Sequence, residues 1–320
     1  MQALLLLSLL AFTHATALPR TADSGRPKFS WPHTQNLLIF GDSYSFVQGT
    51  RGYANYSFIG DAFDVPFTPE ELLSDEIIPK NTSSDGSNWA EFLTGCYSGL
   101  PAKCAPHKLW DFAFAGADIT KAILAPHHNF TLQMVDSVNQ WVKYAADVLN
   151  LSGEDTLVAW WIGINDTGDS AGFSNITDWR AYWEAEMSAY FSAVSLVHSK
   201  GLKNHLFINV PPEERSPAWV NGNPGATTLK AHINLYNDVL AESINKWESE
   251  HGDVNVFQFD AHGWWNYVLD HYLIYGFKNI TGYCECTDDS YFWYNTGHPV
   301  EKVHKLLAGD MERKLLGWSG

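Results

Sequence analysis

The sequence predicts an α/β fold: a three-layer α/β/α sandwich around a doubly wound, mostly parallel sheet of five strands. Three observations predict it. Short apolar runs alternate with longer amphipathic stretches, and each run ends close to Gly, Asp or Pro. Such alternation is typical of a parallel sheet that helices cover on both faces. The chain has 320 residues and is 45% hydrophobic, which is enough to bury the core of one large domain.

The individual elements follow from the same pattern. Apolar runs predict strands at 36–40, 110–115, 156–162, 205–210 and 254–259. Helical spacing predicts helices at 132–149, 178–199, 227–250 and 299–316. Residues 50–108 are rich in Gly, Ser, Pro and aromatic side chains, and we expect a long excursion there that borders a site. Ligands of such sheets bind beyond the carboxyl ends of the strands, so the residues after each strand are the first candidates.

The N-terminal residues have the features of a targeting segment. Residues 3–12 are almost all apolar, and Ala15-Thr16-Ala17 matches a signal peptidase site. The apolar run is too short to span a bilayer. We therefore expect a signal peptide at 1–17, a linker at 18–35, a single domain at 36–320, and a secreted, extracellular protein.

Glycosylation sequons agree with export. A seventh Asn-x-Ser/Thr sequon, at Asn165, follows a predicted strand, so we expect it to be buried and unglycosylated. The other six predict N-glycosylation on an exported surface: Asn55, Asn81, Asn129, Asn150, Asn175 and Asn279.

Four cysteines allow three disulfide connectivities. Proximity in the chain favours Cys96 with Cys104, which leaves Cys284 with Cys286 in a tight loop. Zinc binding is the alternative, and the export signal favours disulfides over it.

The charge balance excludes several classes of partner. With 20 Lys and Arg against 36 Asp and Glu, the formal net charge is −16. Such a chain repels phosphate backbones and anionic lipid surfaces, so we expect neither nucleic acid nor a membrane as a partner. No His-Glu-x-x-His spacing occurs, and we expect no metal, no cofactor and no obligate protein partner.

Four polar positions fall where an α/β sheet places its active site. Ser43 follows the first strand, Gly116 the second and Asn165 the third, and His298 precedes the last helix. A serine hydroxyl needs a neighbouring base to become a nucleophile, and His298 can take its proton. The N–H groups of Ser43 and Gly116 and the amide of Asn165 could surround the oxyanion of an acyl-transfer intermediate.

Two aspartates are expected to support these residues. Asp42 is placed to accept backbone hydrogen bonds in the turn that presents Ser43, and Asp166 to order the loop around Asn165. Trp31, Trp89 and Tyr44 are candidates to border the site, where aromatic rings can stack on sugars. Trp160 and Trp161 are expected to be core residues on opposite faces of one strand.

These motifs resemble a known family. Gly-Asp-Ser at 41–43, a glycine at 116, Gly-x-Asn-Asp at 163–166 and His-Pro at 298–299 are similar to the four blocks of the SGNH (GDSL) hydrolases. The resemblance implies a flavodoxin-like strand order and hydrolysis of esters through an acyl-enzyme. The runs around Gly41 and Trp160, and Phe292-Trp293, look most like secreted fungal acetylesterases of carbohydrate esterase family sixteen. Those enzymes remove acetyl groups from hemicellulose (xylo- or manno-) oligosaccharides, which implies an acetylated oligosaccharide or a small acetyl ester as substrate.

One position departs from the family pattern. The family usually has Asp three residues before its histidine, and this chain has Asn295. Asn295 could orient His298 through its carbonyl oxygen, or a backbone carbonyl, Asp288 or Asp289 could do so. The third interpretation is a catalytically weak protein that binds carbohydrate. A lipase or phospholipase of the same fold is a further alternative.

Overall fold

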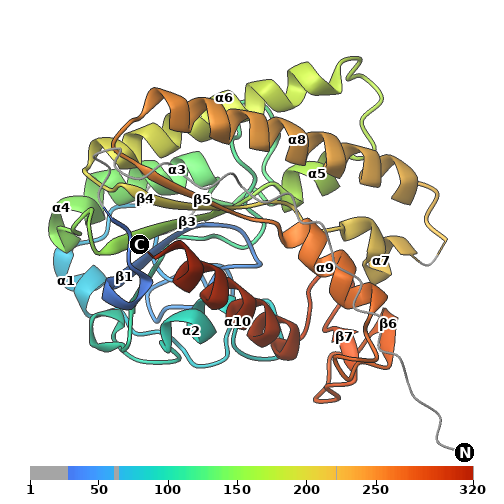
Figure 1. Ribbon diagram of the computed structural model, residues 1–320, viewed down its shortest axis with the longest axis horizontal. Helices are drawn as coiled ribbons and strands as arrows, with labels where there is room; N and C mark the ends of the chain where they lie inside the picture. The colour runs from blue at the N-terminus through green and yellow to red at the C-terminus, as the bar shows by residue number, and fades with distance from the viewer. Residues whose placement is uncertain (1–27, 61–64, 221, 320) are drawn as a thin grey trace, which may run out of the picture.

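A computed structural model describes residues 28–60, 65–220 and 222–319 (Figure 1). Its central sheet has five parallel strands in the order β2-β1-β3-β4-β5, which confirms the predicted fold class and the flavodoxin-like order. The strands are β1 Asn36–Gly41, β2 Lys108–Asp111, β3 Thr156–Trp161, β4 Asn204–Ile208 and β5 Asn255–Phe259. The expected signal peptide at 1–17 lies outside the described residues.

Helices cover both faces of the sheet, as Figure 1 shows. On one face α6 packs against α8 and α3, and on the other α2 packs against α10. The strands between them are buried along almost their whole length, as expected of a parallel sheet covered twice. These helices are α2 Trp89–Thr94, α3 Met134–Gln140, α6 Trp179–Ser199, α8 Ala226–Glu250 and α10 Glu301–Trp318.

Two predicted elements are displaced. The second strand is Lys108–Asp111 instead of 110–115. Beyond it, the N–H groups of Phe112 and Phe114 still donate to the carbonyls of Ile39 and Gly41 in β1, and the Asp111 carboxylate accepts from the N–H groups of Val47 and Ala113. The helix expected at 132–149 is three consecutive pieces: α3, a π-helical turn Trp141–Ala145 and α4 Ala146–Leu149.

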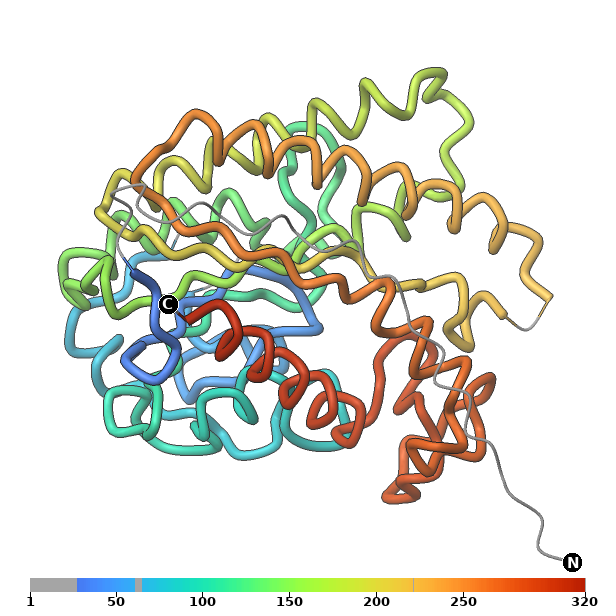
Figure 2. The backbone as a smooth tube through the Cα atoms, in the orientation of Figure 1, coloured from blue at the N-terminus to red at the C-terminus, as the bar shows by residue number. Residues whose placement is uncertain are grey.

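Several short elements were not predicted. The segment between β5 and α10 forms α9 and a small two-stranded sheet, which lie together at one end of the molecule (Figure 2). The unpredicted elements are α1 Pro69–Leu73, α5 Ile164–Ser170, α7 Pro217–Val220, α9 Ala261–Asp270, β6 Asn279–Tyr283 and β7 Tyr291–Trp293. Three single 3₁₀ turns add to them: Trp31–His33, Pro101–Lys103 and Glu213–Arg215.

The packed domain begins before the expected boundary at residue 36. Phe29 and Trp31 belong to the hydrophobic core, so residues 28–35 are packed on the domain rather than forming a linker. The N–H of Trp31 also donates to the Ser319 hydroxyl over 2.9 Å.

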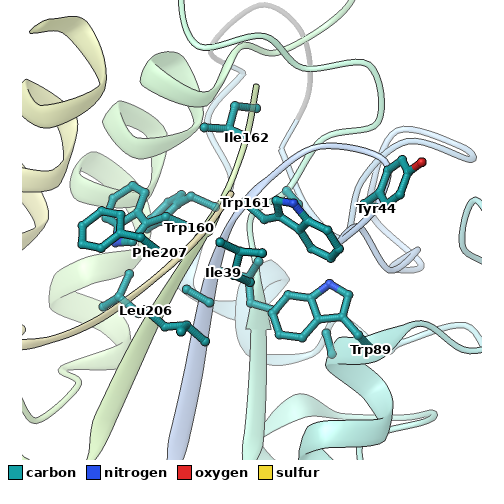
Figure 3. Close-up of a cluster of buried hydrophobic side chains, with 14 of the residues drawn as sticks. Ile39, Tyr44, Trp89, Trp160, Trp161, Ile162, Leu206 and Phe207 are labelled. Carbon is teal, nitrogen blue, oxygen red and sulfur yellow. The ribbon is translucent and has the colours of Figure 1, made fainter. Parts of the chain in front are cut away.

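Aromatic side chains fill the core on both sides of β3 (Figure 3). Trp160 and Trp161 are both fully buried, as predicted, and Trp160 stacks on Phe40 with ring centroids 4.9 Å apart. Trp161 packs edge-on against Trp89 and Tyr44. Because Trp89 is itself fully buried, and Trp31 is only 2% exposed, neither ring is available to a sugar.

Two disulfides are present, Cys96–Cys104 and Cys284–Cys286, which is the predicted pairing. The first joins the loop after α2 to the loop before β2. No helix among the described residues is both long and apolar enough to cross a membrane.

Candidate active site

Ser43 lies in a single tight turn directly after β1, not at the start of a helix. The Asp42 carbonyl accepts hydrogen bonds from the N–H groups of Ser45 and Phe46, each 3.0 Å long. The Asp42 carboxylate accepts a further one from the N–H of Tyr44 at 2.9 Å. Burial raises the pKa of Asp42 to about 7. This closed turn holds Ser43 at the carboxyl edge of the sheet, where it is 8% exposed.

His298 meets Ser43 from the other end of the chain. It lies between β7 and α10, and its Nε2 is 2.7 Å from the Ser43 Oγ. The Tyr44 hydroxyl donates to the Gly297 carbonyl, and the Tyr44 ring lies 5.4 Å from the imidazole between centroids. Tyr44, which follows Ser43, therefore holds Gly297, which precedes His298.

Asn295 determines the tautomer of His298. Its Oδ1 accepts hydrogen bonds from two backbone N–H groups, those of Gly297 at 3.0 Å and His298 at 2.8 Å. These two donors fix which atom of the amide is the oxygen. The Nδ1 of His298 is 3.0 Å from the same oxygen and must therefore carry the proton. The unprotonated Nε2 then faces the Ser43 hydroxyl, which is the form that a general base requires.

Burial lowers the pKa of His298 to about 4. The neutral Asn295 supplies no charge to offset that effect, so the imidazole is neutral through most of the acidic range. Asp288 and Asp289, the alternative partners, are exposed side chains that lie elsewhere: Asp288 accepts from the N–H of Ser290 at 3.0 Å, and Asp289 lies 4.0 Å from the Lys302 ammonium.

The three predicted oxyanion donors each have a hydrogen available. Within the described residues, the N–H groups of Ser43 and Gly116 donate no hydrogen bond. The amide of Asn165 donates one hydrogen to the Ala117 carbonyl over 2.8 Å, which leaves its second hydrogen available. Gly116 has φ +84°, a conformation that favours glycine, so its N–H can be presented without a side chain in the way.

Asn165 is placed by the first turn of α5. Gly163 precedes this helix with φ +118°, and its carbonyl accepts from the N–H of Thr167 at 3.0 Å. The Thr167 hydroxyl in turn donates to the Glu213 carboxylate at 2.8 Å. Asp166 is fully buried and accepts from the N–H of Ile119 at 2.9 Å, which ties the loop after Gly116 to α5.

Sequence reasoning missed two of these supporting residues. It treated Tyr44 as a ring that could border the site, but Tyr44 is 3% exposed and acts through its hydroxyl instead. It did not consider Glu213, whose pKa burial raises well above its usual range. The position of Tyr44 next to Ser43 was a usable signal. Glu213 had none, because it reaches the site only through the fold.

The predicted sequons differ in exposure. Asn165 is half-buried and hydrogen-bonded as described above, whereas full burial was expected. Asn81 and Asn279 are half-buried as well. The exposed sequon asparagines are Asn55, Asn129, Asn150 and Asn175.

Within residues 28–60, 65–220 and 222–319, no group of three or more His, Cys, Asp or Glu side chains is arranged to hold a metal ion. The chemistry that this geometry offers is proton transfer and nucleophilic attack at a serine, with hydrogen-bond donors for a developing negative charge.

Comparisons with known proteins agree with this arrangement. Residues 37–311 match the model of the GDSL-like lipase/acylhydrolase family. An acetylesterase from Thermothelomyces thermophilus is 26% identical over 283 residues, which is 86% of each chain. A solved structure from Parabacteroides merdae, named as a GDSL-like lipase, superposes with a TM-score of 0.50 at 11% identity, over 91% of this chain and 100% of that one, and so shares the fold. This chain belongs to the GDSL-like lipase/acylhydrolase family and is a carboxylic ester hydrolase.

Proposed function

We propose that this protein is a secreted serine esterase that removes acetyl groups from hemicellulose-derived oligosaccharides through an acetyl-enzyme. The observation that carries the chemistry is the 2.7 Å contact between the Ser43 hydroxyl and the unprotonated Nε2 of His298. In this proposal Ser43 is the nucleophile, and His298 is the general base and then the general acid. Asn295 holds the imidazole in the required tautomer.

In the first half-reaction the Ser43 oxygen attacks the acetyl carbonyl carbon, and its proton moves to the Nε2 of His298. The carbonyl oxygen becomes an oxyanion, which the N–H groups of Ser43 and Gly116 and the free amide hydrogen of Asn165 stabilise. His298 then gives its proton to the departing sugar oxygen as the ester bond breaks. The acetyl group remains on Ser43.

In the second half-reaction water attacks the acetyl-enzyme and gives its proton to His298. The bond between the acetyl carbon and the Ser43 oxygen breaks, and that oxygen recovers the proton from His298. Acetic acid leaves and loses its proton to the solvent as acetate, and the free enzyme is restored. The same donors surround the second oxyanion, so one geometry serves both steps.

The choice of substrate rests on different support. The acetyl group follows from the curated relative, which is an acetylesterase over most of both chains. The extracellular oligosaccharide follows from the signal-like N-terminus and from the resemblance to fungal enzymes of carbohydrate esterase family sixteen. Exposed sequons at Asn55, Asn129, Asn150 and Asn175 fit export.

Replacing the nucleophile tests the chemistry. We expect Ser43→Ala to abolish hydrolysis of p-nitrophenyl acetate, because loss of the nucleophile in a serine hydrolase costs on the order of 10⁶ in kcat. Ser192→Ala is the matched control, since Ser192 is an exposed serine on α6. Initial rates of the secreted proteins decide the matter, and comparable turnover by Ser43→Ala would refute the assignment.

A substrate series tests the specificity. Release of acetate from acetylated xylo- and manno-oligosaccharides, with activity falling steeply from p-nitrophenyl acetate to the butyrate and octanoate, would support the proposal. Activity that rises with acyl length would identify a lipase-type enzyme instead. Binding of the oligosaccharides without any turnover would identify a carbohydrate-binding protein.

A further inference from the structure

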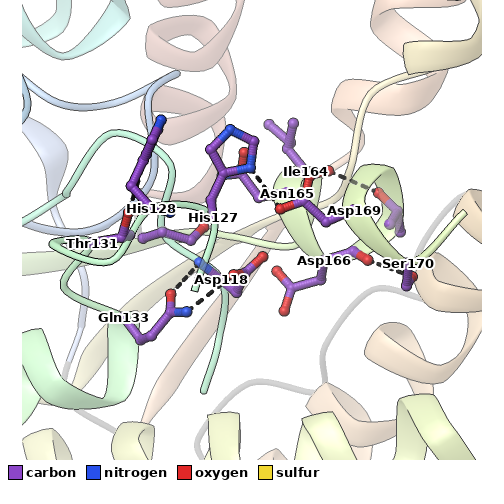
Figure 4. A network of polar contacts seen from close by, with 12 residues as sticks. Asp118, His127, His128, Thr131, Gln133, Ile164, Asn165, Asp166, Asp169 and Ser170 are labelled. Carbon is purple, nitrogen blue, oxygen red and sulfur yellow. Dashed lines mark hydrogen bonds and ion pairs between the residues drawn. The ribbon is translucent and has the colours of Figure 1, made fainter. Parts of the chain in front are cut away.

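Beyond the five residues assigned above, a set of contacts joins the loop after β2 to α5. Figure 4 shows that side chains of α5 point toward this loop. Asn165 and Asp169 are four residues apart on α5, so they lie on the same face of the helix. The three contacts are Asn165 with the Ala117 carbonyl at 2.8 Å, Asp166 with the Ile119 N–H at 2.9 Å, and Asp169 with the His127 Nδ1 at 2.6 Å.

The outermost contact is the one between side chains at the surface. The side chain of His127 is 40% exposed and that of Asp169 30% exposed. The other two contacts use backbone groups of the loop and cannot be lost by exchanging a loop side chain. The His127–Asp169 pair is therefore the part of this connection that a substitution in the loop can remove.

The side chains of His127 and His128 both lie near Gly116. A Cβ placed on Gly116 would be 3.5 Å from the Cδ2 of His127 and 3.3 Å from the Nδ1 of His128. Cδ2 is bonded to Nε2 in the imidazole ring, while Nδ1 on the other side is held by Asp169. The ring edge that carries the second nitrogen is thus the edge nearest to Gly116.

We propose that His127, held by Asp169, is a positioning residue that fixes the Gly116 N–H relative to the Asn165 amide and so shapes the oxyanion hole. The inference rests on the roles proposed above for Ser43, Gly116 and Asn165. His127 acts through Gly116 and does not itself touch the reacting atoms. Its contact with Asp169 spans the two elements that supply the second and third donors.

The pair also gives the site a charge that depends on pH. The hydrogen bond with Asp169 raises the pKa of His127 above its usual range. The other titratable groups that face the pair are Asp118, whose pKa burial raises to about 9, the neighbouring His128, and Glu213 across from Asp169. Below its pKa, His127 is an imidazolium beside Gly116, where a positive charge favours a developing oxyanion.

The protonation of His127 makes kcat depend on pH. As the pH rises through the pKa of His127, the imidazolium becomes neutral, the ion pair weakens and kcat should fall to a lower plateau. His298 must be neutral to act, and its pKa is about 4, so its titration affects only the acidic side of the profile. A partial decline on the alkaline side is therefore the signature of His127.

The experiment compares kcat and KM for p-nitrophenyl acetate from pH 4.5 to 9 in His127→Leu, His127→Gln and Asp169→Asn. We expect His127→Leu to lower kcat about tenfold at pH 6 with KM little changed, because a donor is loosened rather than removed. His127→Gln should recover most of kcat at pH 6, since an amide can donate to Asp169, but should lose the alkaline decline. Asp169→Asn should move that decline to lower pH.

The matched control is His198→Leu. It removes a second His–Asp pair, His198 with Asp253 at 3.2 Å, which joins α6 to the loop before β5 and whose side chains are 19% and 51% exposed. This variant should keep the wild-type profile. Far-ultraviolet circular dichroism and a thermal melt confirm that each variant is folded, and His127→Gln and Asp169→Asn decide the matter if His127→Leu does not fold.

Two results would overturn the inference. One is a wild-type kcat profile in His127→Gln, alkaline decline included. The other is a rise in KM at constant kcat in His127→Leu, which would make His127 a substrate contact instead. Failure of the proposed function is separate, because it would appear as wild-type protein that hydrolyses p-nitrophenyl acetate but releases no acetate from oligosaccharides.

Discussion

At position 295 the chain has an amide where a carboxylate would raise the pKa of the adjacent histidine. With Asn295, the pKa of His298 is about 4, and the imidazole is neutral and able to accept a proton above that pH. On the acidic side, below the titration of His127, we expect kcat/KM of the wild type to be constant down to about pH 5 and to halve near pH 4. Asn295→Asp should move this acidic limb upward by about 1–3 units, because an opposite charge within about 4–6 Å favours the imidazolium.

The pH-independent value of kcat reports a second effect of residue 295, its control of the His298 tautomer. Asn295→Asp keeps an oxygen that can accept from the Nδ1 of His298, so the tautomer and the plateau should stay similar. Asn295→Ala removes that acceptor and should lower kcat by at least about a hundredfold, as wrong-tautomer variants of serine proteases do. The pH profiles of the three proteins measure both effects. An acidic limb that does not move in Asn295→Asp would show that another group controls His298.

At this scale the motif residues could be predicted and their partners could not. Ser43, Asn165 and His298 each follow a local pattern at a strand end or before a helix, and such a pattern is visible in one stretch of sequence. The contacts of Tyr44 with Gly297 and of His127 with Asp169 join segments that only the fold brings together. Nothing in the sequence near His127 distinguishes it from the other histidines.

At the scale of elements, the junction between β3 and α5 is the most constrained. A Cβ on Gly163 would collide with the Tyr236 ring, whose hydroxyl donates to the Ile162 carbonyl at 3.0 Å. The φ of +118° adds backbone strain for any other residue, roughly 1–3 kcal/mol. We expect Gly163→Ala to lower the free energy of unfolding by at least about 2 kcal/mol and to lower kcat, because α5 carries Asn165.

Urea unfolding measures the stability change, and p-nitrophenyl acetate turnover measures the displacement of Asn165. Gly172→Ala is the control, since Gly172 follows α5 in open space. An equally stable and active Gly163→Ala protein would mean that Tyr236 moves aside at no cost.

Whether an element could be predicted from the sequence depended on its length and its burial. Strands buried on both faces, such as β1 and β3, are continuous apolar runs and could be predicted from composition alone. Short α5 has too few turns to show a helical period, and half-exposed β6 has no strand-like alternation. Helix α9 left one usable signal: Asp260, whose side chain caps it by accepting from the Gly263 N–H at 2.8 Å.

At the scale of the whole molecule, buried carboxyl groups set the dependence of stability on pH. Burial raises the pKa of Asp42 to about 7, of Glu91 to about 8 and of Asp118 to about 9. These groups stay protonated in the folded protein at pH values where the unfolded chain has lost their protons. Stability that they contribute at low pH is therefore lost as the pH rises toward the folded pKa values.

Buried histidines have the opposite effect on the pH dependence of stability, but over a different pH range. The pKa values of His205 and His304 are about 3, so they favour the folded state less as the pH falls below 6.5. Above pH 6.5 the carboxyl effect remains, and the raised pKa of His127 acts in the same direction. We therefore expect the melting temperature to fall steadily from pH 6.5 to 9, as scanning calorimetry can measure.

Glu91→Gln provides the control for that slope. The Glu91 side chain accepts from the Asn88 N–H at 2.8 Å, which an uncharged amide oxygen can also do. The variant should show a shallower decline between pH 6.5 and 8 than the wild type. A melting temperature that is flat or rises across this interval would contradict the buried-carboxyl explanation.

The two ends of the described domain meet at the edge of the sheet opposite to Ser43. Phe257 packs between Phe29 and Trp318, with ring centroids 4.5 and 5.0 Å away. Through the pairing of β5 with β4, β3 and β1, Phe257 is level with Ile39, and Ser43 lies four residues, or about 13 Å, further along. A tether attached at residue 319 would thus hold the molecule on the side away from Ser43. An enzyme immobilised in this way would present its catalytic edge to the polymer in solution.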